Sequence, residues 1–470
     1  MTADITALSL IEVASEITAK RVSSVEATRA CLVRFAEHGE RLNCVAGIDP
    51  DAALAAAAAA DAELRAGRRR GPLHGVPLAH KDMFYRAGRV SACGSRIRAD
   101  FVPDHTATVL ARLDDAGALD LARLNMVEFA LGPTGHNEIT GTPRNPWNLD
   151  YITGGSSSGP AAAVAARLVY GTLGSDTGGS VRLPAACCGL VGIKPSYGRV
   201  SRYGSLGLSF TLDHPGPLAR TVADCALLLR IIAGHDPHDA TTSMRPVPDY
   251  LATLEQGVRG LKLAVPENYF YDPVTPEVRV LMDESLAVFR ALGAQVVPVM
   301  IPSIEWANPM VTLIIGVEAA ALHGRWLRER ADDYGKQTRS RLLAGLLYPA
   351  TRYVDALNLR QKLLQDFSDA VFSRADLLHL PVIPIPIPTI AESDLAANPG
   401  SASYILNFGH CTRPFNYLGL PAISVPAGFT ANGLPCGMQL VGRPFAESLL
   451  LQAARAYERE TGWSSRAPAL

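Results

Sequence analysis

The sequence lacks several patterns that would place it in a special class of protein. Its eight cysteines show no CxxC spacing and no Cys/His cluster of the kind that binds a metal. Lys and Arg number 44 and Asp and Glu 45, so the formal net charge of −1 gives no long-range attraction for nucleic acid or an anionic membrane. These absences predict reduced, mostly buried thiols, no metal site and no nucleic-acid partner.

The sequence also shows no stretch that is typical of a targeting signal. The N-terminal stretch MTADITALSLIEVASEI has acidic residues and helical periodicity, whereas a signal peptide has a basic start and an unbroken apolar core. No apolar run approaches the roughly 20 residues that cross a bilayer. The short basic run at 68–70 follows an Ala-rich helix and is interpreted as cations at that helix's C-terminal end. We therefore expect a cytoplasmic protein with no membrane contact.

What the chain does have is enough apolar material for a large core. It has 470 residues, of which 48% are hydrophobic. Helical and strand-like stretches alternate without a repeat or a linker, which predicts one α/β domain over 1–470, with a mixed twisted sheet and helices on both faces. The predicted strands are 76–80, 118–123, 261–265, 295–301, 377–383, 422–428 and 437–442. The predicted helices are 7–20, 24–38, 51–67, 106–116, 160–168, 221–233, 276–292, 303–328, 352–374, 403–418 and 445–460, the second with Ser23 or Ser24 as N-cap and Glu26 in its first turn.

The stretch YITGGSSSGP at 151–160 has three simple interpretations. A flexible linker is disfavoured because a helix-forming alanine run follows directly. A phosphate-binding P-loop is disfavoured because no Lys-Ser/Thr pair follows Gly159. The pattern GxSxG also matches a nucleophile elbow with Ser157 at its centre. An elbow needs a preceding strand, whereas 144–150 has turn chemistry; the downstream histidines His379 and His410 keep this alternative open.

Two other stretches give a fourth interpretation. GVPLAHKD at 75–82 places Lys81 at the end of a short apolar strand. GSDTGGSVRLP at 174–184 places Ser180 after two glycines, where a helix begins. With GGSSSG between them, these stretches put a lysine and two serines in a fixed order along the chain.

These motifs resemble the amidase signature family of serine hydrolases. The likeness rests on GPLHGVPLAHKD, GGSSSG, DTGGSVRLPA and GIKPSYGRVSRYG across a signature core at 71–220, and it continues more loosely in FNYLGLPAISVPAG and GMQLVGRPF. The resemblance implies a Ser–Ser–Lys triad that needs no cofactor. Carried over by position, Ser180 is the nucleophile, Ser156 the bridging serine after a cis peptide bond from Gly155, and Lys81 the general base.

The resemblance also implies an oxyanion hole made of backbone amides, here those of Thr177, Gly178, Gly179 and Ser180. Asp176 and Arg182 flank this loop. They are expected to brace it as an ion pair, with Arg182 as a holder of a substrate carboxylate as the alternative. Ser157 has two open roles, a hydrogen bond within the triad or a cap on the following helix.

Elementary chemistry supports these roles. A lysine is a base only when neutral, and an ordinary pKa of 10.4 leaves about 0.1% of it neutral at physiological pH. Burial lowers that pKa, and the apolar strand before Lys81 suits burial. Because side chains alternate along a strand, His80 and Asp82 are expected to point away from the triad. Cys187 and Cys188, just past Ser180, are interpreted as core residues.

The substrate is less well defined by the sequence. The resemblance implies an amidase acting on small-molecule amides, aryl amides or carbamates. The family also contains the glutamine-hydrolysing component of a tRNA-dependent amidotransferase, which releases ammonia from glutamine for a partner subunit. The region 124–130 with the following GPTGHNEITGTPRNPWN resembles stand-alone amidases. A non-catalytic scaffold is disfavoured because Lys81, Ser156 and Ser180 are all present, and a symmetric homodimer is suggested by family likeness alone.

The variable region at 235–400 is expected to form the substrate pocket. Its helices are apolar enough to hold an acyl chain or an aromatic ring, which favours a neutral or hydrophobic substrate. The candidate pocket residues there, most of which serve equally well as core, are Trp306, Met310, Leu313, Ile314, Trp326 and Tyr348.

Overall fold

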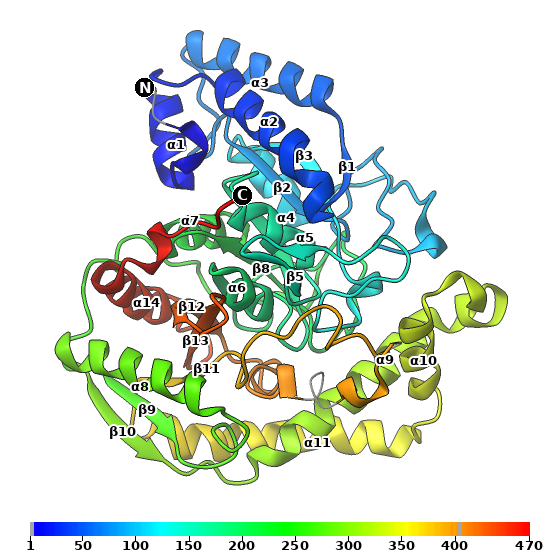
Figure 1. The fold of residues 1–470 in the computed structure, drawn as a ribbon, viewed down its shortest axis with the longest axis vertical. Coiled ribbons are helices and arrows are strands. Elements are labelled where there is room, and N and C mark those ends of the chain that lie inside the picture. The colour runs from blue at the N-terminus through cyan, green and yellow to red at the C-terminus, as the bar shows by residue number, and fades with distance from the viewer. Residues whose placement is uncertain (1–3, 396, 403–406) are drawn as a thin grey trace.

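A computed structural model describes residues 4–395, 397–402 and 407–470 (Figure 1). Its central sheet has eight strands in the order β10-β9-β11-β13-β12-β7-β8-β6. Strand β9 pairs in parallel with β10 and β11, and the other neighbours are antiparallel, so the sheet is mixed as predicted. The strands are β6 (Gly171–Asp176), β7 (Val191–Lys194), β8 (His214–Ala219), β9 (Lys262–Pro266), β10 (Gln295–Val299), β11 (Leu377–Pro381), β12 (Ala422–Phe429) and β13 (Pro435–Gly442).

A three-stranded sheet in the order β1-β3-β2 lies beside the end of the large one. Its strands are β1 (Val45–Ile48), β2 (Pro77–Lys81) and β3 (Leu119–Leu124). Strand β2 reaches β6 through side chains: the Leu173 N–H donates to His80 Nδ1 at 3.1 Å, and Lys81 Nζ lies 2.9 Å from Ser175 Oγ. This contact brings the strand that carries Lys81 next to the loop that carries Ser180.

Helices flank the large sheet, which confirms the predicted α/β class. In Figure 1 the N-terminal helices cover one end of the molecule and α9 to α11 the opposite end. The helices are α1 (Leu10–Thr18), α2 (Ser24–Leu42), α3 (Pro50–Arg65), α4 (Thr108–Asp115), α5 (Ser158–Ala165), α6 (Arg182–Cys188), α7 (Val222–Ile232), α8 (Pro276–Ala291), α9 (Ala307–Glu329), α10 (Lys336–Gly345), α11 (Ala350–Phe367), α13 (Arg413–Tyr417) and α14 (Glu447–Thr461).

The start of α2 follows the local signals in the sequence. The Glu26 N–H donates to Ser23 Oγ at 3.1 Å, and the Ser23 N–H donates to Glu26 Oε2 at 2.7 Å. This reciprocal capping box satisfies two backbone donors that the first helical turn leaves unpaired. It confirms Ser23, rather than Ser24, as the N-cap.

Several predicted elements were wrong. The turn expected at 144–150 holds a small hairpin, β4 (Arg144–Asn145) and β5 (Asn148–Ile152). The strands β6, β7 and β8 were not predicted, because stretches such as GTLGSD and HPGPLA are rich in Gly and Pro and read as loops. Of the helix expected at 403–418, residues 403–406 lie outside the described part, and the helix described there is the short α13.

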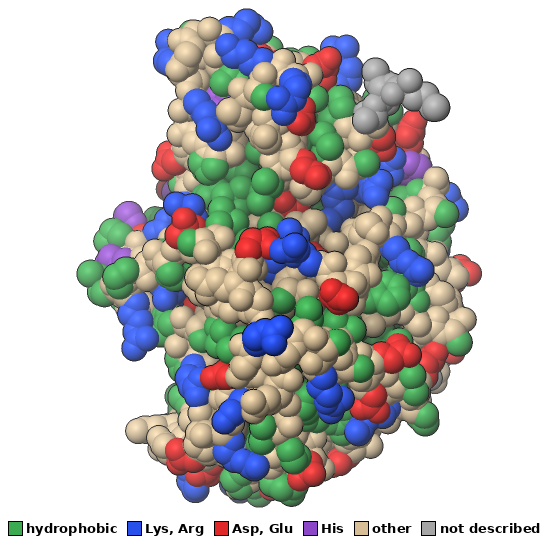
Figure 2. Space-filling model, turned by 90° about the vertical axis from the view of Figure 1, so that its left-hand side faces the viewer, with side chains coloured by type: hydrophobic (Ala, Val, Ile, Leu, Met, Phe, Trp, Pro, Cys, Tyr) green, Lys and Arg blue, Asp and Glu red, His purple; other side chains and the backbone are tan. Residues whose placement is uncertain are grey.

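Two features relate to the expected partners, namely the charges on the surface and the apolar character of one long helix. On the face shown in Figure 2, Lys and Arg side chains are interspersed with Asp and Glu over most of the area, in keeping with the net charge of −1. One segment, Ile304–Glu329, is long and apolar enough to cross a membrane by length and composition, which the sequence analysis did not anticipate. A buried core helix can have the same length and composition. In this segment, 39% of the most apolar 18-residue stretch is buried.

Candidate active site

Lys81 and Ser156 meet as the motifs predicted. Lys81 ends β2 with 1% of its surface exposed, and its Nζ lies 2.7 Å from Ser156 Oγ. A second contact, to Ser175 Oγ at 2.9 Å, was missed by sequence reasoning, although Ser175 lies inside the GSDTGGS stretch. The amine is therefore held by two hydroxyl groups in a buried site.

The environment of Lys81 suits a base. Burial lowers the pKa of Lys81 to about 7, although the carboxylates of Asp213 and Asp176 act in the opposite direction. A pKa near 7 leaves a large fraction of the amine neutral at neutral pH, and only the neutral amine accepts a proton. The requirement stated from the sequence, a buried lysine with a depressed pKa, is thus met.

The neighbours of Lys81 in sequence point away from it. Asp82 Oδ1 lies 3.3 Å from Arg123 Nε, and the Ala92 N–H donates to Asp82 Oδ2 at 3.1 Å. His80 accepts its hydrogen bond from the backbone of β6. Strand alternation correctly predicted that both side chains point away from Lys81.

The peptide bond between Gly155 and Ser156 is cis, as the resemblance implied. A Cβ at residue 155 would lie 2.7 Å from Gly135 N and 2.8 Å from Gly132 O, so no side chain fits there. The carbonyl oxygen of Ser156 accepts a hydrogen bond from the Val127 N–H at 3.2 Å. These contacts fix the backbone that presents the Ser156 hydroxyl to Lys81.

The Ser157 side chain takes neither expected role, although the Ser157 backbone N–H donates to Ser180 O at 3.3 Å. The helix after it begins at Ser158, and Ser157 makes no side-chain capping bond. Instead the Ser175 N–H donates to Ser157 Oγ at 3.3 Å, and Ser157 is fully buried. Its hydroxyl ties the Ser156 loop to β6, which is a structural role.

Ser180 lies on the wall of a cavity of about 300 Å³ and is 8% exposed. Its carbonyl oxygen accepts a hydrogen bond from the Ser157 N–H at 3.3 Å, which joins the two serine loops. No hydrogen bond links the hydroxyl groups of Ser156 and Ser180, both of which the structure describes. The structure therefore places the two residues on adjoining loops, and proton transfer between them stays a proposal.

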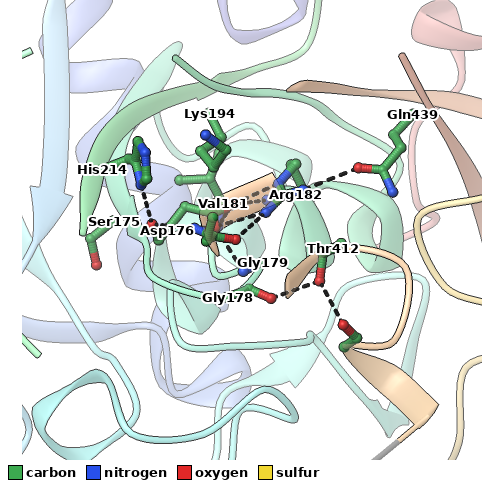
Figure 3. A network of polar contacts seen from close by, with 12 residues as sticks. Ser175, Asp176, Gly178, Gly179, Val181, Arg182, Lys194, His214, Thr412 and Gln439 are labelled. Atoms are coloured by element: carbon green, nitrogen blue, oxygen red, sulfur yellow. Dashed lines mark hydrogen bonds and ion pairs between the residues drawn. The ribbon is translucent and has the colours of Figure 1, made fainter. Parts of the chain in front are cut away.

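The loop before Ser180 is held from two sides (Figure 3). The Gly179 N–H donates to Asp176 Oδ1 at 2.7 Å, and Thr412 Oγ1 donates to Gly178 O at 2.7 Å. Gly179 has φ of 134°, and a Cβ there would lie 2.4 Å from Thr412 Oγ1, so this position requires glycine. Because the Gly179 N–H already donates to Asp176, Gly179 is a poorer candidate for an oxyanion-hole donor than Thr177, Gly178 and Ser180.

Asp176 and Arg182 form the brace that the sequence analysis favoured. Arg182 Nε lies 3.0 Å from Asp176 Oδ2, both side chains are fully buried, and the guanidinium also donates to Gln439 Oε1 (Figure 3). The guanidinium donates to Asn416 Oδ1 as well, at 2.7 Å. Burial by itself would raise the pKa of Asp176, but the Arg182 charge and its hydrogen bonds hold the pKa well below its usual range. Arg182 is thus committed to this network and not to a substrate.

Removing one partner of this ion pair should destabilise the protein strongly. Asp176→Asn leaves the Arg182 guanidinium buried without a counter-charge, so we expect a loss of about 3–5 kcal/mol in the free energy of unfolding. Denaturant titration measures it. The matched control is Asp283→Asn, which breaks the exposed Arg279–Asp283 pair and should cost less than about 0.5 kcal/mol. Equal, small losses in both variants would contradict the bracing role.

The Thr412 hydroxyl offers a second test of the loop. Thr412→Val keeps the shape but leaves Gly178 O without this partner, a change that costs about 1–3 kcal/mol. We expect kcat to fall about 5- to 100-fold with KM nearly unchanged, because the loop that carries the amides loses its position. Thr412→Ser should restore most of kcat. A Thr412→Val enzyme with wild-type kcat would show that the contact does not position the loop.

The structure also locates the residues that the sequence suggested for the substrate pocket. Of the six candidate pocket residues, Tyr348 lines the cavity, and Ala130, from the region 124–130, lines it too. Trp306 is 53% exposed, and Ile314 is buried in the core. The remaining three candidates, Met310, Leu313 and Trp326, are partly buried and pack against the core. The cavity wall also contains residues that the sequence analysis did not select, namely Leu131, Gly132, Pro133, Leu183, Leu208, Thr312, Ile315, Gly316, Ala319, Arg341, Ala344 and Arg413.

Strand β5 supplies the preceding strand that the nucleophile-elbow alternative needs, but neither candidate histidine lies beside Ser157. His379 Nε2 lies 2.8 Å from Ser285 Oγ, and His410 Nε2 lies 3.0 Å from Tyr269 O, so both rings are engaged away from Ser157. Throughout the described ranges, no group of three His, Cys, Asp or Glu side chains is arranged to hold a metal. All eight cysteines are buried and unpaired by disulfides.

Comparison with known proteins agrees with this geometry. The Amidase family model matches residues 26–451. The chain belongs to the amidase signature family. The chain is accordingly an enzyme of a family that acts on amide C–N bonds, and the motifs quoted from the sequence identified it correctly.

Three relatives show the breadth of this family. The A subunit of the glutamyl-tRNA(Gln) amidotransferase from Geobacter metallireducens is 40% identical over 483 residues, covering 98% of this chain and 98% of the relative. A chain from a solved vestigial protein complex, described as revealing the origins of an s-triazine catabolic enzyme, superposes with a TM-score of 0.90 at 32% identity, covering 97% of this chain and 99% of that one. A bacterial aryl acylamidase superposes with a TM-score of 0.89 at 28% identity, covering 99% of this chain and 100% of that one.

Proposed function

We propose that this amidase hydrolyses a small-molecule amide through an acyl-enzyme on Ser180. The observation that carries the proposal is the buried Lys81 amine, with a pKa near 7, hydrogen-bonded to Ser156 beside the Ser180 loop. A neutral lysine in that position is the base that a serine nucleophile lacks.

The proposed steps follow from the placement of these groups. Ser180 Oγ attacks the amide carbonyl while its proton passes to Ser156, whose own proton passes to Lys81. The carbonyl oxygen becomes an oxyanion, which the N–H groups of Thr177, Gly178 and Ser180 stabilise. The C–N bond then breaks as the proton returns from Lys81 through Ser156 to the leaving nitrogen. Water attacks the resulting ester by the same route, which releases the carboxylic acid and restores Ser180.

A second candidate is the glutamine-hydrolysing component of an amidotransferase, which hydrolyses an amide for a partner chain. The whole-length identity of 40% to the Geobacter protein favours it. The same catalytic groups serve either function, so the two differ in whether the isolated chain is active. A cytoplasmic location suits both, and a homodimer remains a prediction from family likeness.

Ammonia and amine release by the purified chain tests the proposal. The chain alone is incubated with primary amides, anilides and carbamates, beside the Ser180→Ala variant. Turnover by the isolated chain that is lost in Ser180→Ala is the expected result. Turnover that occurs only after a partner chain is added would support the second candidate.

A further inference from the structure

The cavity beside Ser180 carries charge of a single sign. Its wall is mostly apolar, and its charged side chains, among all the described residues that line it, are Arg341 from α10 and Arg413 from α13. No Asp or Glu lines it, and the residues outside the described ranges include no acidic residue. A substrate bound at Ser180 therefore lies beside two arginines and no acidic residue.

Both arginines are fixed next to the catalytic loops. Arg341 Nη1 donates to Leu131 O at 2.7 Å, and Leu131 itself lines the cavity. The stem of Arg413 packs on the oxyanion loop, since a Cβ at Gly178 would lie 3.3 Å from Arg413 Cγ. Gly409 leaves room for the Arg413 guanidinium, because a Cβ there would lie 2.8 Å from its Nε.

The nearby carboxylates accept hydrogen bonds from backbone groups and do not form an ion pair with Arg341. Glu128 and Glu138 share a smaller neighbouring hollow with it. Glu128 accepts a hydrogen bond from the Gly335 N–H at 3.0 Å, and Glu138 accepts one from the Lys336 N–H at 2.6 Å. Within the described ranges, no carboxylate forms an ion pair with Arg341.

The buried environment of the two arginines disfavours their charged forms. Burial lowers the pKa of Arg341, and burial together with the Arg341 charge lowers the pKa of Arg413 to about 10. A bound anion would supply a compensating charge, and the planar guanidinium matches the two oxygens of a carboxylate.

We propose that the substrate is an amide whose acyl part ends in a carboxylate, with Arg341 and Arg413 as the residues that select it. This inference rests on the proposed function and names its substrate class. It replaces the neutral or hydrophobic substrate that the sequence favoured. It also disfavours an amino acid amide such as glutamine, because the wall holds no acidic group to pair with the α-ammonium.

Two series of matched amides separate the effect of a carboxylate on binding from the effect of an added ammonium group. Glutaramate carries a carboxylate, pentanamide has none, and glutamine adds an ammonium to glutaramate; succinamate, butyramide and asparagine repeat the comparison with one carbon fewer. Each compound is tested as a protector of Ser180 against a fluorophosphonate, and its binding to the Ser180→Ala variant is measured by calorimetry. We expect one of the two carboxylate amides to protect and bind at concentrations at least about 10-fold lower than its neutral and zwitterionic counterparts.

Variants assign the selectivity to the two arginines. Arg413→Gln and Arg341→Gln should each weaken binding of the carboxylate amide at least about 10-fold and change binding of the neutral amide less than about 3-fold. Arg413→Lys should retain part of the preference. The matched control is Arg339→Gln on the same helix as Arg341, because Arg339 pairs with Asp332 and does not line the cavity.

The outcomes are distinct. Equal or better binding of the neutral or zwitterionic amides, or no measurable binding by either carboxylate amide, would overturn the inference. A preference that survives both glutamine substitutions would overturn the assignment to these arginines. Failure of unprotected Ser180 to react with the fluorophosphonate would count against the proposed function, while calorimetry still tests the carboxylate preference.

Discussion

Replacing Ser180 with alanine is expected to lower kcat by at least about 10⁴-fold, the largest effect of any single change in this site. The hydroxyl is the proposed point of covalent attachment, and neither Ser156 nor Lys81 forms an acyl-enzyme in its place. Ammonia release under saturating amide measures it. Substrate binding should persist, because the cavity wall and both arginines are unchanged.

Ser157→Ala is the matched control for this result. It removes a hydroxyl from a neighbouring serine that is fully buried and bonded to Ser175. We expect it to keep the acylation site and to lose activity far less than Ser180→Ala does. A Ser157→Ala enzyme without activity, beside an active Ser180→Ala enzyme, would show that Ser180 is not the nucleophile.

Replacing Lys81 with methionine is expected to lower kcat about 10²- to 10⁴-fold, the range that a positioned general base contributes. Methionine fills similar space and accepts no proton, so the loss reports chemistry more than packing. The wild-type enzyme should show kcat/KM rising with pH through about 7 and levelling above it, because Lys81 must lose its proton to act and its pKa is about 7. Lys81→Met should lose this inflection.

Lys194→Met controls for the loss of a buried lysine. Lys194 is fully buried on β7, and burial lowers its pKa well below the ordinary value. Its Nζ donates to Pro195 O and, among the described residues, forms no hydrogen bond with a serine. We expect this variant to keep the inflection near pH 7 even if its stability changes. An inflection that moves in Lys194→Met and stays in Lys81→Met would contradict the assignment of the base.

The proposed catalytic residues were more predictable than the structure around them. Lys81, Ser156 and Ser180 stand in short motifs whose chemistry constrains residue type and order. The depressed pKa of Lys81 followed from its apolar strand. Strand alternation was sufficient to exclude Asp82 and His80 from the triad. The division into a signature core at 71–220 and a variable region at 235–400 stays a prediction.

Contacts between segments that lie far apart in the chain could not be predicted from the sequence. Thr412 meets Gly178, and Arg413 packs on the same loop, although about half the chain separates them. The donor role expected of Gly179 was revised because its N–H reaches Asp176, a detail of loop conformation. The strands β6 and β8 were missed because their Gly and Pro residues have low intrinsic strand preference, and burial within the sheet overrides that preference.

The most direct test of the account is to treat the protein with a reactive fluorophosphonate and map the adduct by mass spectrometry. The account predicts one adduct on Ser180, absent in Ser180→Ala and formed much more slowly in Lys81→Met. An adduct on Ser157 or another serine, or no adduct on the folded wild-type chain, would contradict the proposed nucleophile and the mechanism built on it.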